Sequence, residues 1–346
     1  MMGETTTSWN APEDWERVLT VDAHAEGEPL RVIMSGFPQP EGTTVLERRR
    51  YARSHLDRFR SALVWEPRGH ADMYGCLVMP PVTPEADLAV LFIHNEGFST
   101  MCGHGIIGVC TVLLETGRLP RREPETSIVI DTPAGLVRAR ATVEGGRVRD
   151  VRFVNVPSFT PAVGKRVNVP AWGPVSYDLA YGGAFYAFVD AAGLELQLET
   201  SNVGAIIQAG RAIKEAVVAH PEIIHPEEPD LGFLYGTIFT GPASDSRYHS
   251  RHVCVFADGE VDRSPTGTGV SARLAILHAR GELETGEEIT IESLIGTRFT
   301  GRITEHTRVG EHDAIVPEVG GRAFLTGRHE FLLDPEDPLR DGFLVR

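Results

Sequence analysis

Two stretches of this sequence, CGHGIIGVCTVLLETGRL at residues 102–119 and TGTGVSARLAILHARGEL at residues 266–283, align without a gap. In each stretch the first residue is followed by a Gly-x-Gly and an apolar run that ends near a glycine, which predicts a helix in both copies. Identical residues fill five of the 18 aligned positions: Gly103/Gly267, Gly105/Gly269, Leu113/Leu277, Gly117/Gly281 and Leu119/Leu283. After each stretch the two copies match again, where residues 130–135 align with residues 291–296. A repeat of this kind predicts two copies of one α/β unit, facing each other across a pseudo-two-fold axis.

The segments around the repeat predict a similar order of elements in both copies. In the first series we expect helices at 43–63 and 102–117, and strands at 17–22, 30–34, 73–79, 88–94, 127–131, 136–143 and 148–154. In the second we expect helices at 202–218 and 266–280, and strands at 183–189, 232–239, 252–257, 288–292, 298–304 and 314–319. The fold class is therefore α/β (α+β) with two pseudo-symmetric domains. We place a flexible tail at 1–14, an N-terminal domain at 15–160, to which the C-terminal tail at 330–346 is a candidate addition, and a C-terminal domain at 161–329.

Cys102 and Thr266 stand where the two repeated helices begin. The first N–H groups of a helix have no intrahelical partner, and the helix dipole places positive charge there. We therefore predict that the pKa of the Cys102 thiol lies below its free value of about 8.5. A bound carboxylate can be held by four N–H groups, with Cys102 and Thr266 on opposite faces of its α-carbon. Those N–H groups belong to Gly103, His104, Gly267 and Thr268.

The other three cysteines, Cys76, Cys110 and Cys254, lie in apolar runs without CxxC spacing, so we interpret them as buried apolar side chains. A thiol–imidazole pair is a second interpretation of Cys102, but His104 is only two residues away and is predicted to point elsewhere. Neither helix start carries a phosphate-binding glycine motif.

Composition and charge exclude several classes of protein. Hydrophobic residues make up 42% and charged residues 23%, which is typical of a globular chain. The net charge of −15 argues against a nucleic-acid partner, and we interpret the basic run at residues 48–50 as the solvated face of a helix. The longest apolar run, residues 88–93, is too short to cross a membrane. Without a secretory signal in the sequence, the cysteines predict free thiols and a cytoplasmic location.

Two histidine-containing groups are candidate metal ligands. The first is His24, Glu26 and Glu28, and the second is His249 and His252. Nothing in the sequence fixes a third partner for either group. We therefore predict hydrogen bonding within loops and no metal site.

Six motifs, two of which include the starts of the repeated helices, together resemble signatures of the proline racemase family. They are MCGHG at 101–105, DRSPTGTG at 262–269, DAHAEGEPLR at 22–31, YGGAFY at 181–186, TEHTR at 304–308 and PEVGG at 317–321. The family includes proline racemases, hydroxyproline 2-epimerases and trans-3-hydroxy-L-proline dehydratases. The resemblance covers nearly the whole chain and implies the diaminopimelate-epimerase-like fold, in which the strands of each domain wrap around a central helix.

One departure from the family pattern implies the activity. Racemases and epimerases of the family carry a cysteine at both helix starts, whereas this sequence has Thr266 at the second, as the dehydratases do. A hydroxyl is a far weaker acid than a thiol, so two-base inversion is disfavoured. The resemblance implies dehydration of trans-3-hydroxy-L-proline to Δ1-pyrroline-2-carboxylate without a cofactor. Cys102 would accept the proton and Asp262 would bind the ring nitrogen. Gly103, His104, Gly267 and Thr268 would cradle the carboxylate, and Phe256 would form a pocket wall.

Several alternatives stay open. Asp262 could serve only as a charge or cap at a helix N-terminus. The enzyme could instead be a hydroxyproline 2-epimerase or proline racemase that uses Thr266 or a water as the second acid. A third interpretation is that the chain is not an enzyme but a protein that binds imino acids without catalysis. The expected partner is a small imino acid, and the chain is a candidate homodimer.

Overall fold

The computed structural model of the chain describes residues 9–219 and 223–345. The predicted tail at 1–14 falls largely outside this part: residues 1–8 are not described, and Trp9 packs edge-on against Trp15. Within the described residues, no helix is both long and apolar enough to cross a bilayer.

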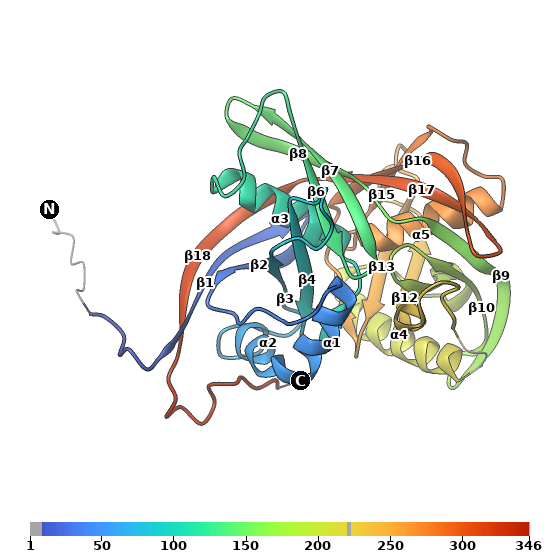
Figure 1. Cartoon of the computed structure of the whole chain (residues 1–346). Helices are drawn as coiled ribbons and strands as arrows, with labels where there is room; N and C mark the ends of the chain where they lie inside the picture. The colour runs from blue at the N-terminus through green and yellow to red at the C-terminus, as the bar shows by residue number, and fades with distance from the viewer. Residues whose placement is uncertain (1–8, 220–222, 346) are drawn as a thin grey trace, which may run out of the picture.

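Two series of elements follow one another along the chain (Figure 1). The first series comprises β1 (Glu16–Ala25), β2 (Glu28–Ser35), α1 (Val45–His55), α2 (Asp57–Val64), β3 (Tyr74–Met79), β4 (Leu88–His94), β5 (Gly97–Ser99), α3 (Gly103–Glu115), β6 (Glu125–Thr132), β7 (Gly135–Glu144), β8 (Arg147–Val154) and β9 (Ser158–Val169). The second comprises β10 (Gly173–Tyr181), β11 (Phe185–Asp190), α4 (Val203–Val218), β12 (Leu234–Gly241), β13 (Ser250–Phe256), β14 (Glu260–Val261), α5 (Gly267–Ala279), β15 (Glu288–Glu292), β16 (Arg298–Val309), β17 (His312–Gly321) and β18 (Ala323–Leu333). Short 3-10 helices at Ala191–Leu194, Thr200–Asn202 and Pro229–Leu231 complete the second series.

Strand pairing shows that the second series repeats the first. The pairs β2–β3 and β11–β12 are parallel, β3–β4 and β12–β13 are antiparallel, and β4–β6 and β13–β15 are parallel again. The carboxylates of Asp131 and Glu292 are matched in the sequence repeat, and they accept hydrogen bonds from matching loops. Asp131 accepts from Val82 and Thr83 in the β3–β4 loop, and Glu292 accepts from Ser244 in the β12–β13 loop. The predicted pseudo-two-fold repeat is therefore present in the fold.

The last strand of each series pairs with the other series. Strand β9 runs antiparallel to β10, and β18 runs antiparallel to β1, from Glu16 opposite Leu333 to Ala25 opposite Ala323. Strands β8 and β17 also pair across the two series. The predicted boundaries at 160 and 329 fall inside β9 and β18, so the division at those residues stays a prediction.

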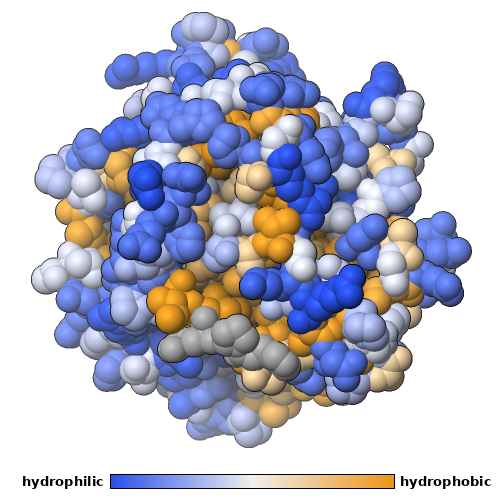
Figure 2. All heavy atoms as spheres, turned by 90° about the vertical axis from the view of Figure 1, so that its right-hand side faces the viewer, coloured by the Kyte–Doolittle hydropathy of each residue, from blue (hydrophilic) through white to orange (hydrophobic). Residues whose placement is uncertain are grey.

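The face of the second series in Figure 2 is mostly polar, with hydrophobic side chains in small separate groups.

Helices α3 and α5 lie at the centre of the two halves, with strands around them, whereas α1, α2 and α4 lie on the outside (Figure 1). Every residue of α3 from Gly103 to Leu114 is buried, which explains why the sequence of this helix is apolar on all sides. The core around α3 continues into the core around α5 as one hydrophobic cluster. The sequence prediction of two central helices is correct.

The helix predicted over 43–63 is wrong in one respect, because the structure has two helices there. Thr44 and Glu47 form a capping box that starts α1. Leu56, with φ −120° and ψ 9°, ends α1 and begins α2. This break turns the apolar face of α2 toward the sheet, where Phe59, Leu63 and Val64 are buried.

The two central helices meet at their first residues. A β-carbon added to Gly103 would lie 2.5 Å from the Cα of Gly267, and one added to Gly267 would lie 2.7 Å from the Cα of Gly103. Real β-carbons do not approach backbone atoms so closely, and neither backbone can yield as a flexible side chain does. Glycine at both positions is therefore required for the helix starts to touch.

We predict that Gly267→Ala weakens this contact and lowers the free energy of unfolding by about 1–3 kcal/mol, the usual cost of overpacking. Urea denaturation measures the change. Gly204→Ala is the matched control, because Gly204 lies in α4 with no atom within 4 Å of an added β-carbon. In a helix this control change is expected to be neutral or stabilising. Equal stability of Gly267→Ala and the wild type would contradict the role given to the glycine contact.

Candidate active site

Cys102 is the residue just before α3, with an extended backbone at φ −147° and ψ 112°. This conformation turns its side chain back over the first helical turn, where Sγ accepts a hydrogen bond from the Gly105 N–H at 3.2 Å. Sγ is also 3.2 Å from Nδ1 of His104. The prediction that His104 points elsewhere is therefore wrong, because the extended residue brings Sγ to the side chain of the second helical residue.

The predicted direction of the Cys102 pKa is also wrong for this closed site. Burial raises the pKa of the thiol well above its ordinary value, and the nearby carboxylates of Asp262 and Glu28 raise it further. The Gly105 N–H and the Tyr74 hydroxyl act in the opposite direction, with smaller effect. The helix start stabilises a thiolate as predicted, but full burial outweighs it.

His104 is neutral at physiological pH. Burial, together with the charge of Arg263, lowers the pKa of the imidazole to about 3. A hydrogen bond between the ring and the Pro29 backbone acts against this shift. The neutral imidazole can accept a proton from the Cys102 thiol or donate to the thiolate, depending on its tautomer.

Thr266 begins the second helix with a different backbone. Its φ of 64° and ψ of 95° lie outside the regions that β-branched residues favour, a strain that typically costs about 1–3 kcal/mol. The hydroxyl does not cap the helix but donates to Oδ2 of Asp262 at 2.8 Å. Ser264 holds this loop, since its N–H donates to Oδ1 of Asp262 and its hydroxyl accepts from the Thr266 N–H. The hydroxyl proton of Thr266 is therefore directed at a carboxylate.

Asp262 is buried beside this threonine. Burial raises the pKa of its carboxyl, and the hydrogen bonds from Ser264 and Thr266 partly offset that effect. Its neighbour Glu28 is fully buried and accepts a hydrogen bond from the Arg263 N–H at 2.7 Å. Burial, followed by the charge of Asp262, raises the pKa of Glu28 well above its ordinary value. Glu28 is already paired with the Arg263 guanidinium at 3.1 Å, so Asp262 is the carboxyl of this pair that lines the reaction cavity.

All eight site residues predicted from the sequence line one cavity of about 20 Å³, which we call the reaction cavity. These are Cys102, Gly103, His104, Phe256, Asp262, Thr266, Gly267 and Thr268. The residues are drawn from both halves and meet where Gly103 contacts Gly267. The space suffices for about one water molecule, so this is a closed form of the site.

Five further lining residues were missed from the sequence: Tyr74, Met101, Tyr186, Tyr235 and Cys254. The hydroxyl of Tyr186 is 2.8 Å from that of Thr268, and the hydroxyls of Tyr74 and Tyr235 are 3.4 Å apart. A signal for the last pair was present, because a Tyr-Gly dipeptide opens β3 and follows the first residue of its counterpart β12. Cys254 was interpreted as a buried apolar side chain, yet it lines the cavity, and its thiol lies close enough to the Thr266 hydroxyl for a hydrogen bond.

The two candidate metal groups have other surroundings. His24 stacks on Phe324 with ring centroids 5.4 Å apart, and its Nδ1 accepts from the Gly27 N–H. His252 is buried beside Phe188. Over the described part of the chain, no three histidine, cysteine or carboxylate side chains are grouped to hold a metal ion.

Comparison with known proteins gives consistent matches. The family model described as "Proline racemase" matches residues 20–344. A trans-3-hydroxy-L-proline dehydratase from Burkholderia cenocepacia is 44% identical over 94% of this chain and 98% of its own length. A 3-hydroxyproline 2-epimerase from Burkholderia multivorans is 45% identical over the same shares of the two chains.

Among solved structures, a hydroxyproline epimerase from Agrobacterium vitis with bound trans-4-hydroxy-L-proline superposes with a TM-score of 0.91. It is 34% identical, over 95% of this chain and 96% of that one. The fold predicted from the sequence, with strands wrapped around two central helices, is thereby confirmed.

The pKa of Cys102 leads to a prediction about its alkylation. A raised pKa keeps the thiol protonated at neutral pH, so iodoacetamide should modify folded Cys102 more slowly at pH 7.5 than the same residue in the urea-unfolded chain. The rate should still be rising with pH above about 8.5, the pKa of a free thiol. Peptide mass spectrometry measures both rates. A plateau in the folded protein below pH 8 would show instead that the helix start prevails over burial.

Proposed function

The chain belongs to the proline racemase family, and we propose that it dehydrates trans-3-hydroxy-L-proline to Δ1-pyrroline-2-carboxylate. Identity alone does not separate this activity from epimerisation, because relatives of both names are 44–45% identical. The observation that carries the proposal is Thr266 at the second helix start, with its hydroxyl proton donated to Asp262. A base faces one side of the site, and no thiol stands at the corresponding position on the other.

Substrate binding follows from the charges of the site. The carboxylate would lie between the two helix starts, bound by the N–H groups of Gly103, His104, Gly267 and Thr268. The ring ammonium would lie against Asp262, a buried carboxyl that lines the reaction cavity. Phe256, stacked on Tyr235 at 5.3 Å, would form the apolar wall beside the ring. The reaction cavity must widen before this substrate can enter.

Binding also activates the base. A positive ring nitrogen near Cys102 favours the thiolate, so the charge that burial disfavours is stabilised when the substrate is in place. The thiol proton is lost to solvent before the site closes around the substrate, and the neutral imidazole of His104, 3.2 Å from Sγ, can donate a hydrogen bond to the thiolate. The thiolate then removes the proton from C2 of the substrate.

The elimination needs one acid–base group. In the trans isomer the C3 hydroxyl lies on the same face of the ring as the C2 hydrogen, and therefore faces Cys102. As the C2–H bond breaks, its electron pair forms the C2–C3 double bond and the C3–O bond breaks. The new Cys102 thiol returns its proton to the leaving oxygen, which departs as water and regenerates the thiolate. The enamine product then tautomerises to the imine. These reaction steps require no cofactor, because the N–H groups at the helix starts stabilise the charge that develops on the carboxylate.

Epimerisation of hydroxyproline at C2 is the second candidate activity. Inversion requires a proton donor on the face opposite Cys102. Thr266 is a poor donor there because its proton is engaged by Asp262, although Cys254 lies beside it. A protein that only binds imino acids would have no need for a buried thiol 3.2 Å from an imidazole.

Two further properties stay predictions. A cytoplasmic location is supported by the four cysteines, all of which are buried and unpaired by disulfides. The homodimer is predicted only from the sequence and family resemblance.

Cys102→Ser should reduce turnover of trans-3-hydroxy-L-proline at least a hundredfold, because a serine hydroxyl is a far weaker acid–base group than a thiol. Loss of substrate and gain of the dehydrated product can be followed by mass spectrometry. Cys110→Ala is the matched control, since Cys110 lies on the same helix and outside the reaction cavity. Residual activity above one hundredth in Cys102→Ser would exclude Cys102 as the base. A wild type that yields only an epimer would exclude the dehydratase.

Thr266→Ala should retain dehydration and lose about 1–3 kcal/mol of transition-state stabilisation, the value of one hydrogen bond to a charged group. Thr266→Cys should add slow inversion at C2, because it places a thiol on the second face. Chiral chromatography of recovered substrate checks the second variant and product mass the first. A Thr266→Ala variant as inactive as Cys102→Ser would mean that Thr266 takes part in proton transfer.

A further inference from the structure

A second and larger cavity lies outside the reaction cavity, and we call it the outer cavity. Its volume is about 700 Å³, and both halves contribute to its wall. The first half supplies residues of α1 and the β4–β5 turn, and the second supplies residues of α4, the start of β12 and the segment after β13. Nothing in the proposed chemistry uses this space.

Only one layer of rings separates the two cavities. Tyr235 lines both, His94 lines the outer cavity, and Tyr74 and Phe256 line the reaction cavity. His94 lies 5.9 Å from Phe256 and 5.6 Å from Tyr74, measured between ring centroids. Tyr235 is the second residue of β12 and lies at an irregularity in its pairing with β11, where Leu234 and Gly236 are opposite Phe185 and Tyr186. Displacing this one ring would join the two cavities.

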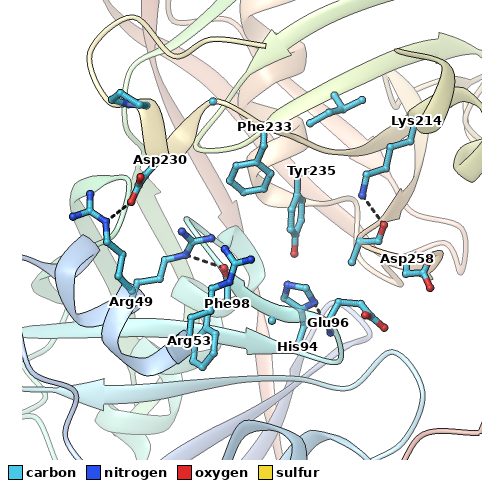
Figure 3. A pocket seen from close by; sticks show the side chains of 16 residues that line it. Arg49, Arg53, His94, Glu96, Phe98, Lys214, Asp230, Phe233, Tyr235 and Asp258 are labelled. Atoms are coloured by element: carbon cyan, nitrogen blue, oxygen red, sulfur yellow. Dashed lines mark hydrogen bonds and ion pairs between the residues drawn. The ribbon is translucent and has the colours of Figure 1, made fainter. Parts of the chain in front are cut away.

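Charge is distributed unevenly around the outer cavity. Figure 3 shows Arg49 and Arg53 on one side and Lys214, Glu96 and Asp258 on the other, with Tyr235 and His94 between them. Arg50, also on the arginine side, is paired with Asp230 at 2.6 Å. Within the described chain, by contrast, neither Arg49 nor Arg53 has an ion pair, in a protein with a net charge of −15.

Arg49 sits deeper than Arg53. Its Nε donates to the Phe98 carbonyl at 2.9 Å, which fixes the guanidinium in the wall and leaves its other N–H groups to the cavity. Burial, and then the charge of Arg53, lower the pKa of Arg49, so an anion between the two would be stabilised by both. Two neighbouring guanidinium groups are complementary to a carboxylate. Across the cavity, Glu96 lies beside Lys214 and beside Asp258, which is paired with Arg211 at 3.1 Å.

We propose that the outer cavity is the entrance to the reaction cavity, where Arg49 and Arg53 bind the carboxylate of an incoming zwitterionic imino acid. Tyr235 is the ring that moves to admit it. The identity of the ligand rests on the proposed function, but the route does not, because it concerns the access of any small molecule to Cys102 past Tyr235, which lines both cavities. The route can therefore be tested without turnover.

The first experiment measures alkylation of Cys102 by iodoacetate, an anion, and by iodoacetamide, its neutral analogue. We expect Arg53→Gln to slow the iodoacetate reaction about 1.5- to 5-fold, the loss of one exposed charge interaction, and to leave the iodoacetamide reaction unchanged. Arg53 is exposed and outside the reaction cavity, so folding should be unaffected. Arg48→Gln, which removes the same charge from the same helix outside the outer cavity, should alter neither rate.

A removable plug provides the second test. In Arg53→Cys, a bulky disulfide-forming reagent would fill the mouth of the outer cavity, while the four native cysteines are buried. We expect at least a tenfold loss of iodoacetamide reaction at Cys102, and of kcat/KM for any imino acid that the wild type converts, both restored by reductant. Ser54→Cys, at the next residue of α1 but outside the cavity, should be insensitive to the same reagent.

Unchanged alkylation of Cys102 in the plugged Arg53→Cys variant would overturn the route. Equal effects of Arg53→Gln on iodoacetate and iodoacetamide would overturn the carboxylate role of the arginines. If no imino acid is dehydrated but both alkylation results hold, the proposed function fails and the entrance stands.

Discussion

The contact between Gly103 and Gly267 is the constraint on which the rest of the site depends. Two central helices, each wrapped by its own strands, can touch end to end only if neither first residue carries a β-carbon. That contact brings the unpaired N–H groups of both helix starts to one point between the halves. It also fixes the preceding residues, Cys102 and Thr266, on either side of that point. The strands that cross between the halves, β9 and β18, hold the arrangement from outside.

The two halves are similar in fold and different in chemistry. Cys102 has an ordinary extended backbone and its sulfur caps its own helix, whereas Thr266 has a left-handed φ and gives its proton to Asp262. One start is thus built around a proton acceptor and the other around a hydrogen-bonded hydroxyl. In the proposed reaction this asymmetry directs the chemistry to one face of the substrate. Since the C2 hydrogen and the leaving hydroxyl share that face, a single thiol is sufficient.

The two central helices and the repeat could be predicted from the sequence, because the residue patterns that indicate them are local. The apolar runs of α3 and α5, their glycine starts and the segments at 130–135 and 291–296 all lie within short windows. Strand β18 was missed because it is largely exposed and its partner β1 lies at the other end of the chain. Strands β9 and β10 form a local hairpin, but β9 contains Pro161 and a run of exposed residues in place of a regular alternation. The pKa of Cys102 was predicted in the wrong direction, since its burial depends on rings contributed by distant strands, such as Tyr74 and Tyr235. His104 was misplaced for a local reason, the extended backbone of Cys102, that a helix pattern does not reveal.

The central claim is that proton removal on the Cys102 face leads to loss of water rather than to inversion. Incubation of the wild type with trans-3-hydroxy-L-proline in D2O, followed by proton NMR and chiral chromatography, measures both outcomes in one sample. The account predicts that the imine product accumulates and that the remaining substrate keeps its configuration at C2. Accumulation of the C2 epimer with solvent deuterium at C2, and without imine, would contradict it.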